Sequence, residues 1–444
     1  ASPFAGQPEL SVKTLVQEVL SRNPTLVQMV AAWQAAQARP PQAKALEDPM
    51  LNTRVGPAAF GSDRVDGAFM VELSQKLPFP GKRGLRGENA LAEASAAGNE
   101  VEDTRLQLIE SAQSAYSDYF LAERAGEVNR RSLDLLQRLR KSAVSRYESG
   151  KTPTRQEVLQ ADVELGREQD RRLALALARE VAVARLNTLM HLPPDSPLPP
   201  SPRQLNLGVS LPDTVALRAA ALARRPDMRA AADRVRAEQA SLGLAEREFY
   251  PDVEVMAAYD AFWQERPLRP QVGLRLNLPV YKAKRYAAVD EARARIVRRL
   301  AELDRLTDRA SFEVQEAYAQ VRRSEQGVRL YKQTILDKAR QNREEAESAY
   351  EKGLIPFVSL IDAQRTEVGL QDRYYEAVAD YFRRWAALER AIGGPLEPWP
   401  PPELPGGPGP AGCVPGCCRP GGPSGHGLPA AHAITSWRRR PSWG

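Results

Sequence analysis

The chain is poor in cysteine, histidine and aromatic residues, and it has no long apolar run. Its three cysteines all follow residue 412, so no disulfide holds the preceding part of the chain together. The best candidate for a transmembrane helix, residues 173–192, is interrupted by arginine and glutamate and cannot lie bare in lipid. If this chain crosses a membrane, it must therefore do so with β-strands that close into a barrel.

Patterns that carry catalysis are also missing. The sequence has only three histidines, and it shows no glycine-rich phosphate loop and no nucleophile elbow. We therefore predict a protein that is not an enzyme and holds no cofactor, with His191 as a structural residue at a helix end. One group of soft metal ligands lies near the C-terminus, but its spacing matches no metal site that we can justify. Its members are Cys413, Cys417, Cys418 and His426.

The net charge of +6 does not indicate a nucleic-acid-binding protein. Four arginines and no acidic residue lie in the last forty positions, and subtracting them from +6 leaves about +2 for the rest. Acidic and basic residues are interspersed along that part, as on a solvated helical surface. From residue 396 onward the chain is dense in proline and glycine, which predicts a disordered tail over 396–444.

The body of the sequence is a tandem duplication, with an offset of about 202 residues between the two repeats. The clearest landmarks are dipeptides and turns that contain proline: Asn23-Pro24 and Arg225-Pro226, Leu77-Pro78 and Leu278-Pro279, Gly150 with Pro153 and Gly353 with Pro356. We predict a first repeat over 8–206, with a helix, a β-hairpin over 50–77 and a long helical hairpin over 82–192. The second repeat spans 207–395, with a helix, a β-hairpin over 252–278 and a long helical hairpin over 282–392.

Two kinds of periodicity define the elements of each repeat. The opening segments 12–46 and 212–248 have a helical pattern, and the hairpins that follow alternate apolar and polar residues with a period of two. Residues 82–148 and 282–352 then run without proline and with apolar residues at three-four spacing, which predicts helices on the order of 100 Å long. Such helices have no globular core to wrap, and four strands cannot close a barrel, so neighbouring copies must complete the wall.

These residues resemble the TolC family of outer-membrane factors over about nine-tenths of the chain. The most specific stretches are Leu73 to Arg83, which contains Pro-Phe-Pro-Gly-Lys, and Tyr350 to Arg365, which contains Leu-Ile-Asp-Ala-Gln-Arg. The first stretch looks most like the CzcC and CusC branch, which serves heavy-metal efflux. The resemblance implies a mainly α fold with a small β part, in which three identical subunits share a twelve-stranded transmembrane β-barrel and an α-barrel.

The resemblance also implies a location and partners. The homotrimer would lie in the outer membrane of a Gram-negative bacterium, in contact with lipid, and extend into the periplasm. There it would meet an adaptor, the membrane fusion protein, and through it an inner-membrane pump of the resistance-nodulation-division (RND) type. The expected function is passive conduction of substrate, with heavy-metal cations favoured. The alternatives are a duct for drug efflux or type I secretion, and, from another class, a soluble coiled-coil scaffold.

Two sets of site residues follow from the resemblance. Asp362 would point into the constricted end of the tunnel, where three copies repel one another and attract cations. Some relatives carry a second acid one turn earlier, where this chain has Ser359, so more of the closure would depend on Phe357 and Ile361. The helical tips would dock the adaptor through eight residues: Arg146, Tyr147, Gly150, Pro153, Tyr350, Lys352, Gly353 and Pro356. The alternative is that Asp362 is a solvated acid and the two glycines only cap helices.

Basic residues follow the last strand of each hairpin. The first group, after the second strand, is Lys76, Lys82, Arg83 and Arg86, and the second group, after the fourth strand, is Lys282, Lys284 and Arg285. Two interpretations stay open for them. They lie against anionic groups at the membrane boundary, or they are ordinary solvated residues at the start of a helix.

Overall fold

The structure, a computed structural model, describes residues 4, 6–57, 69–148, 155–205, 207 and 211–396. The chain divides into two units, 1–402 and 403–444, and the second unit lies outside the described residues. The predicted disordered tail and its four candidate metal ligands therefore lie outside the described residues as well. Everything below concerns the first unit.

The helices and strands follow one order twice. The first half contains α1 (Val12–Arg22), α2 (Pro24–Gln37), α3 (Arg39–Lys44), β1 (Met50–Val55), β2 (Phe69–Leu77), α4 (Lys82–Glu148) and α5 (Arg155–Leu189). The second half contains α6 (Thr214–Arg224), α7 (Pro226–Arg247), β3 (Val253–Asp260), the 3-10 turn η2 (Arg266–Leu268), β4 (Pro270–Leu276), α8 (Lys282–Leu330), the π-helical turn η3 (Tyr331–Ile335), α9 (Leu336–Glu351) and α10 (Phe357–Ala391). This tandem order confirms the predicted fold class of a mainly helical, duplicated chain with one small sheet.

The opening helix of each half is interrupted, and here the prediction of one continuous helix was wrong. The segment 12–46 forms three helices, and 212–248 forms two. The cause is visible in the sequence, because Pro24 and Pro226 lack an N–H and fit only the first turn of a new helix. The predicted helix 282–352 contains a π-helical turn at Tyr331–Ile335, which no residue pattern in the sequence predicted.

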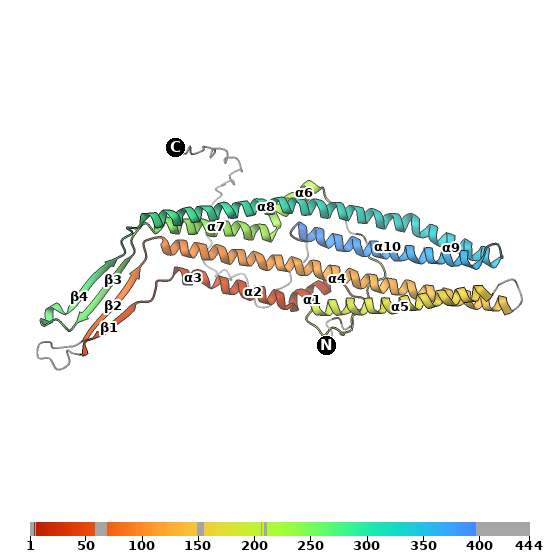
Figure 1. Cartoon of the computed structure of the whole chain (residues 1–444), viewed down its shortest axis with the longest axis horizontal. Helices are drawn as coiled ribbons and strands as arrows, with labels where there is room; N and C mark the ends of the chain where they lie inside the picture. The colour runs from red at the N-terminus through yellow and green to blue at the C-terminus, as the bar shows by residue number, and fades with distance from the viewer. Residues whose placement is uncertain are drawn as a thin grey trace, which may run out of the picture. The chain divides into compact units, whose positions relative to one another are not determined.

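Figure 1 shows the four strands at one end of the helical layers and the turn between α9 and α10 at the other. The central helix is α4, which contacts α5, α7 and α10 along its length. On the second half α8 packs against α7 and α10. The sheet has the order β1-β2-β3-β4, and every neighbouring pair is antiparallel.

The core consists of three separate clusters along the helices rather than one centre. The first joins α1 and α2 to α4 and α5 around Tyr116 and Leu186. The second joins α6 to α8 and α10 around Val314 and Tyr381. The third lies at the helical tips. His191, the one described residue other than glycine with a positive φ (+54°), ends the turn after α5, which agrees with its predicted structural role. No helix of the described part combines the length and the apolar character that crossing a membrane requires.

Candidate functional site

The sheet has one apolar and one polar face. Cross-strand neighbours in one row are Leu51, Leu73, Ala257 and Val272, and those in the next row are Asn52, Glu72, Ala258 and Gln271. The apolar row lies bare, since Val272 is 90% exposed and Leu51 is 64% exposed. A contiguous apolar face of this kind is stable only against lipid or another protein. The period-two pattern predicted this face, although residues 58–68 of the first hairpin lie outside the described residues.

Both edges of this sheet are open within the described part of the chain. The outer strands β1 and β4 each pair on one side only. An edge strand presents unpaired N–H and C=O groups, which bind another strand or require water. An apolar face beside an open edge cannot remain in lipid, because hydrocarbon offers the edge no hydrogen bonds.

A buried lysine lies where the sheet meets the helices. Lys82, the first residue of α4, has no exposed side-chain surface, and its Nζ is 2.9 Å from Oδ1 of Asp252 and 3.3 Å from Oε1 of Glu248. The same Asp252 oxygen accepts a hydrogen bond from the backbone N–H of Phe79 at 2.8 Å. Both sequence-based interpretations of Lys82, a membrane-facing cation and a solvated helix start, were therefore wrong. The partners lie about 170 residues away, and the local sequence does not reveal them.

The helical tips of the two halves share one apolar cluster. Tyr350 packs against Phe357 with ring centroids 5.4 Å apart and planes tilted by 58°, and both rings are buried with Ile361. The Tyr350 hydroxyl donates to Glu157 of α5 at 2.8 Å, and burial followed by this carboxylate raises the pKa of Tyr350 to about 12. The guanidinium of Arg146 covers the Tyr350 ring at 4.9 Å.

The predicted gate and docking residues differ in their exposure. Phe357 and Ile361 are 1% and 3% exposed, so they pack inside the subunit. Tyr350, at 4% exposed, supports the tip from within. Two residues of the predicted set are exposed on the gate side: Asp362 and Ser359. At the docking side the exposed members are Tyr147, Lys352, Gly353 and Pro356, while Gly150 and Pro153 lie outside the described residues. The roles of these exposed residues stay predictions.

Gly353 has a geometric reason of its own. Its φ is +74°, and the N–H of the next residue, Leu354, donates to the carbonyl of Ala349 at 2.9 Å. This left-handed residue ends α9 and turns the chain toward α10. The glycine thus caps a helix, as the simpler sequence interpretation stated.

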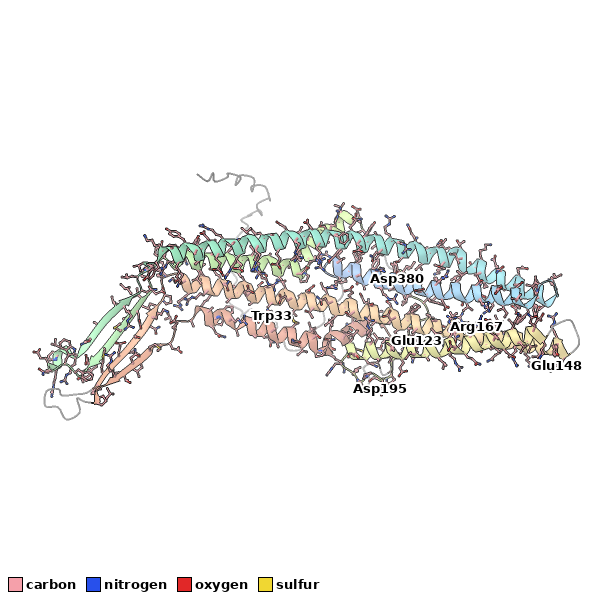
Figure 2. The ribbon with its side chains drawn as sticks, in the orientation of Figure 1. Trp33, Glu123, Glu148, Arg167, Asp195 and Asp380 are labelled. Atoms are coloured by element: carbon pink, nitrogen blue, oxygen red, sulfur yellow. The ribbon has the colours of Figure 1, made fainter. Side chains whose placement is uncertain are left out.

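An ion-pair network ties the two helical hairpins together above the tip. Arg365 of α10 donates to both carboxylate oxygens of Glu164 of α5, from Nη2 to Oε1 and from Nε to Oε2, the latter at 3.0 Å. It also donates to Asp362 at 3.2 Å. The hydrogen bond from Arg365 holds the pKa of Glu164 below its usual range. Arg167, labelled on α5 in Figure 2, adds a third contact to Glu164 at 3.1 Å. The sequence pointed to Asp362 but missed this network.

The middle of the helical layers contains a second feature that sequence reasoning missed. Asn23 donates to the carbonyl of Leu189 at 2.9 Å, and Arg225 donates to that of Ala391 at 3.3 Å. In both halves, therefore, the residue before the helix-starting proline caps the end of the returning helix. The signal was present, because these two dipeptides were repeat landmarks.

Arg225 also lines a charged cavity of about 500 Å³ between α4, α8 and the end of α10. Its guanidinium contacts Asp227 at 2.8 Å and Glu313 at 2.6 Å. Burial alone would lower the pKa of Arg225, but the two carboxylates raise it above its usual range. Within the described ranges, no group of three or more histidine, cysteine, aspartate or glutamate side chains is arranged to hold a metal ion.

Comparison with solved structures identifies the fold. The outer-membrane channel OprN matches with a TM-score of 0.73 at 21% identity, over 89% of this chain and 94% of that one. CusC, described in connection with transmembrane channel formation, matches with a TM-score of 0.73 at 18% identity, over 87% and 92%. The outer membrane protein VceC from Vibrio cholerae matches with a TM-score of 0.72 at 21% identity, over 87% and 97%. The duplicated chain with its four-stranded sheet has the fold of TolC-type outer-membrane channels.

The sequence itself places the chain within a family. The model of the outer membrane efflux protein family matches residues 15–190 and 217–394, which is more than half of the chain. This protein belongs to the outer membrane efflux protein family. Comparison with curated protein sequences finds no match.

Proposed function

We propose that this protein is the outer-membrane channel of a tripartite efflux system and works as a homotrimer. The observation that carries the proposal is the four-stranded sheet with a bare apolar face and two open edges. Three copies placed edge to edge give twelve strands in a closed barrel, with the apolar face toward lipid and the polar face toward the lumen. Closure satisfies the open edges of β1 and β4, and the apolar face no longer contacts water.

The helices support the same assembly. A stripe of apolar side chains on α5 is bare, with Leu173, Leu177 and Val181 between 59% and 67% exposed. On α8 Val297 and Phe312 are 65% and 66% exposed. Helix α5 packs on α4, helix α8 packs on α7 and α10, and Figure 1 shows α5 and α8 on opposite sides of the helical layers. In a ring, the α5 flank of one subunit meets the α8 flank of the next and buries both stripes.

The substrate class that we favour is heavy-metal cations, delivered by a periplasmic adaptor and an RND-type pump. Two features support this choice. The stretch Pro78 to Lys82 is similar to that of the heavy-metal branch, and the exposed carboxylate of Asp362 lies near the tip, where three copies would concentrate cations. The adaptor would bind the exposed tip surface at Tyr147, Lys352 and Pro356. The channel itself supplies no energy.

Two experiments test the proposal in sequence. Purified from membranes in detergent, the full chain is expected to have the mass of a trimer and to form hollow particles with three-fold symmetry. A monomer that is soluble without detergent would instead support the coiled-coil scaffold. Deletion of the gene is then expected to sensitise cells to zinc, cadmium, cobalt or copper. Sensitivity to a drug panel alone, or loss of a secreted protein, would leave the proposed channel in place but show that its substrate is a drug or a protein and not a metal.

A further inference from the structure

The junction between sheet and helices is closed in the first half of the chain. There the link from β2 to α4 docks on the link from α7 to β3, which belongs to the second half. Lys82 is buried against Asp252 and Glu248, and the ring of Phe79 stacks on Tyr250 with centroids 4.5 Å apart and planes 11° from parallel. An apolar stack and a buried ion pair thus hold two consecutive repeats together at the base of the sheet.

The equivalent link in the second half, from β4 to α8, is exposed at its start, although Arg285 of α8 donates to the carbonyl of Glu248 at 2.6 Å and Tyr286 packs on Phe249 with ring centroids 5.2 Å apart. Like α4, α8 begins on a lysine, Lys282, and Lys284 follows it. Both lysines are exposed, and neither makes an ion pair within the part of the chain that the structure describes. Val280 and Tyr281 beside them are 67% and 78% exposed, whereas their counterpart Phe79 is covered by Tyr250. Within the described residues, Lys282 and Lys284 thus have no counterpart of the acidic contacts that bury Lys82.

The complementary surface lies at the other edge of the sheet. The link from α3 to β1 is the counterpart of the link that receives Lys82, and it carries Glu47 and Asp48 just before Pro49. Both acids are exposed; Glu47 contacts the exposed Lys76 at 3.3 Å, and Asp48 has no ion pair within the described ranges. Met50 next to them is 61% exposed. The link from α3 to β1 is therefore acidic, has an apolar residue beside it, and lies at the open edge of the sheet.

The two bare links cannot meet within one chain. They belong to β1 and β4, which lie at opposite edges of the sheet with β2 and β3 between them. Three strand spacings separate them, or about 14 Å. A second copy of this chain presents the missing acidic link in the right order. Its β1 would lie beside β4 of the first copy, as β3 lies beside β2 within one chain.

We propose that Lys282 and Lys284 of one subunit dock on Glu47 and Asp48 of the next subunit, and that this contact repeats the Lys82 junction around the ring. The proposal rests on the homotrimer of the proposed function and names the contact that sets its register. Tyr281 and Val280 then cover the apolar border of the acidic link, as Phe79 covers Tyr250. Each subunit interface carries one such contact, and the ring closes with three.

A zero-length carbodiimide, which joins lysine to carboxylate only when the two are in contact, tests this arrangement on the detergent-solubilised full chain. The expected product is a covalent dimer and trimer ladder on a denaturing gel, with mass spectrometry linking the peptide of 282–284 to that of 47–48. The intrachain pair of Lys76 and Glu47 serves as the internal control for the reaction. Substituting Lys282→Arg with Lys284→Arg keeps the charge but removes the amine, so this link should vanish while the trimer persists.

Charge reversal supplies an independent measurement. Lys282→Glu with Lys284→Glu is expected to raise the rate of trimer dissociation in detergent about tenfold. Adding Glu47→Lys with Asp48→Lys should bring the rate most of the way back to the wild-type value, because contacting residues are coupled by about 1.4 kcal/mol. Lys332→Glu with Lys338→Glu, farther along the same helix line, is the matched control and should change the rate little.

The outcomes separate the two proposals. A native trimer with no link between these peptides, or with charge reversals whose effects simply add, overturns the docking contact and leaves the channel intact. A wild-type protein that is monomeric in detergent overturns the channel assembly itself. A specific link that disappears in the arginine variant, together with rescue by the charge swap, supports the contact.

Discussion

Replacing Lys82 by methionine removes a buried charge while keeping most of the side chain's volume. Its ammonium lies 2.9 Å from Asp252 and 3.3 Å from Glu248, and the side chain has no exposed surface. At an effective dielectric constant of about 20, the closer pair attracts with roughly 6 kcal/mol, much of which the desolvation of the two ions offsets. Removing one partner of a buried pair usually costs about 3–5 kcal/mol. Because Asp252 keeps its hydrogen bond from Phe79 and is slightly exposed, we expect about 2–4 kcal/mol.

Unfolding in detergent, followed by circular dichroism as denaturant is added, measures this effect at one fixed protein concentration. Lys82→Met should lower the free energy of unfolding, and the double variant with Asp252→Asn should recover part of the loss, because the second change removes the unpaired carboxylate. The matched control is Lys338→Met on α9, an exposed lysine that should leave the midpoint unchanged. If the double variant loses the sum of the two single losses, Lys82 and Asp252 are not coupled, and the account of the junction is wrong.

Four shorter predictions concern the tips and the helix ends. Arg365→Ala removes the link between the hairpins and should increase uptake of a bulky antibiotic by cells, with Arg365→Lys intermediate; unchanged uptake would contradict a role in closure. Because the folded protein lowers the pKa of Glu164 from 4.5, the ion pair between Arg365 and Glu164 is complete above pH 4.5 and is lost as the pH falls through the pKa of the folded state. Single-channel conductance should therefore rise on acidification and not on alkalinisation. In Gly353→Ala the new Cβ lies in open space, so the only cost is backbone strain of about 1 kcal/mol. In Gly393→Ala the new Cβ would lie 2.8 Å from a backbone nitrogen, so the unfolding midpoint of this variant in denaturant should fall further. Asp362→Asn should reduce the preference of the channel for cations in bilayer recordings, with the trimer unchanged.

Local signals in the sequence located most of the elements. The predicted start of the long helix at Lys82 and its end at Glu148 agree with the structure, because proline-rich and glycine-rich stretches bracket it. The alternation of residues placed the strands and their apolar face. Local chemistry also explains where the prediction failed, since Pro24 and Pro226 divide helices that an apolar pattern alone would join. The π-helical turn has no such signal.

The candidate sites were less accessible to sequence reasoning. Asp362 was found through a motif, and the structure shows it exposed, but the motif says nothing of its neighbour's contact with Glu164. Phe357 and Ile361 were expected at the gate because they are apolar and close to it. Their burial depends on Tyr350 and on helices α4 and α5, whose positions no short stretch of sequence encodes.

The sequence by itself determined the duplication, the long helices and the two-faced strands. These properties depend on residues that are close in sequence, where sterics and periodicity decide the outcome. Only the tertiary structure decided which charged residues are buried and which are free. Lys82 and Lys282 begin equivalent helices with the same residue, yet one is enclosed and the other is bare. The difference is whether the chain brings a distant acidic link against the helix start, because the environment of a charge is set by what packs on it.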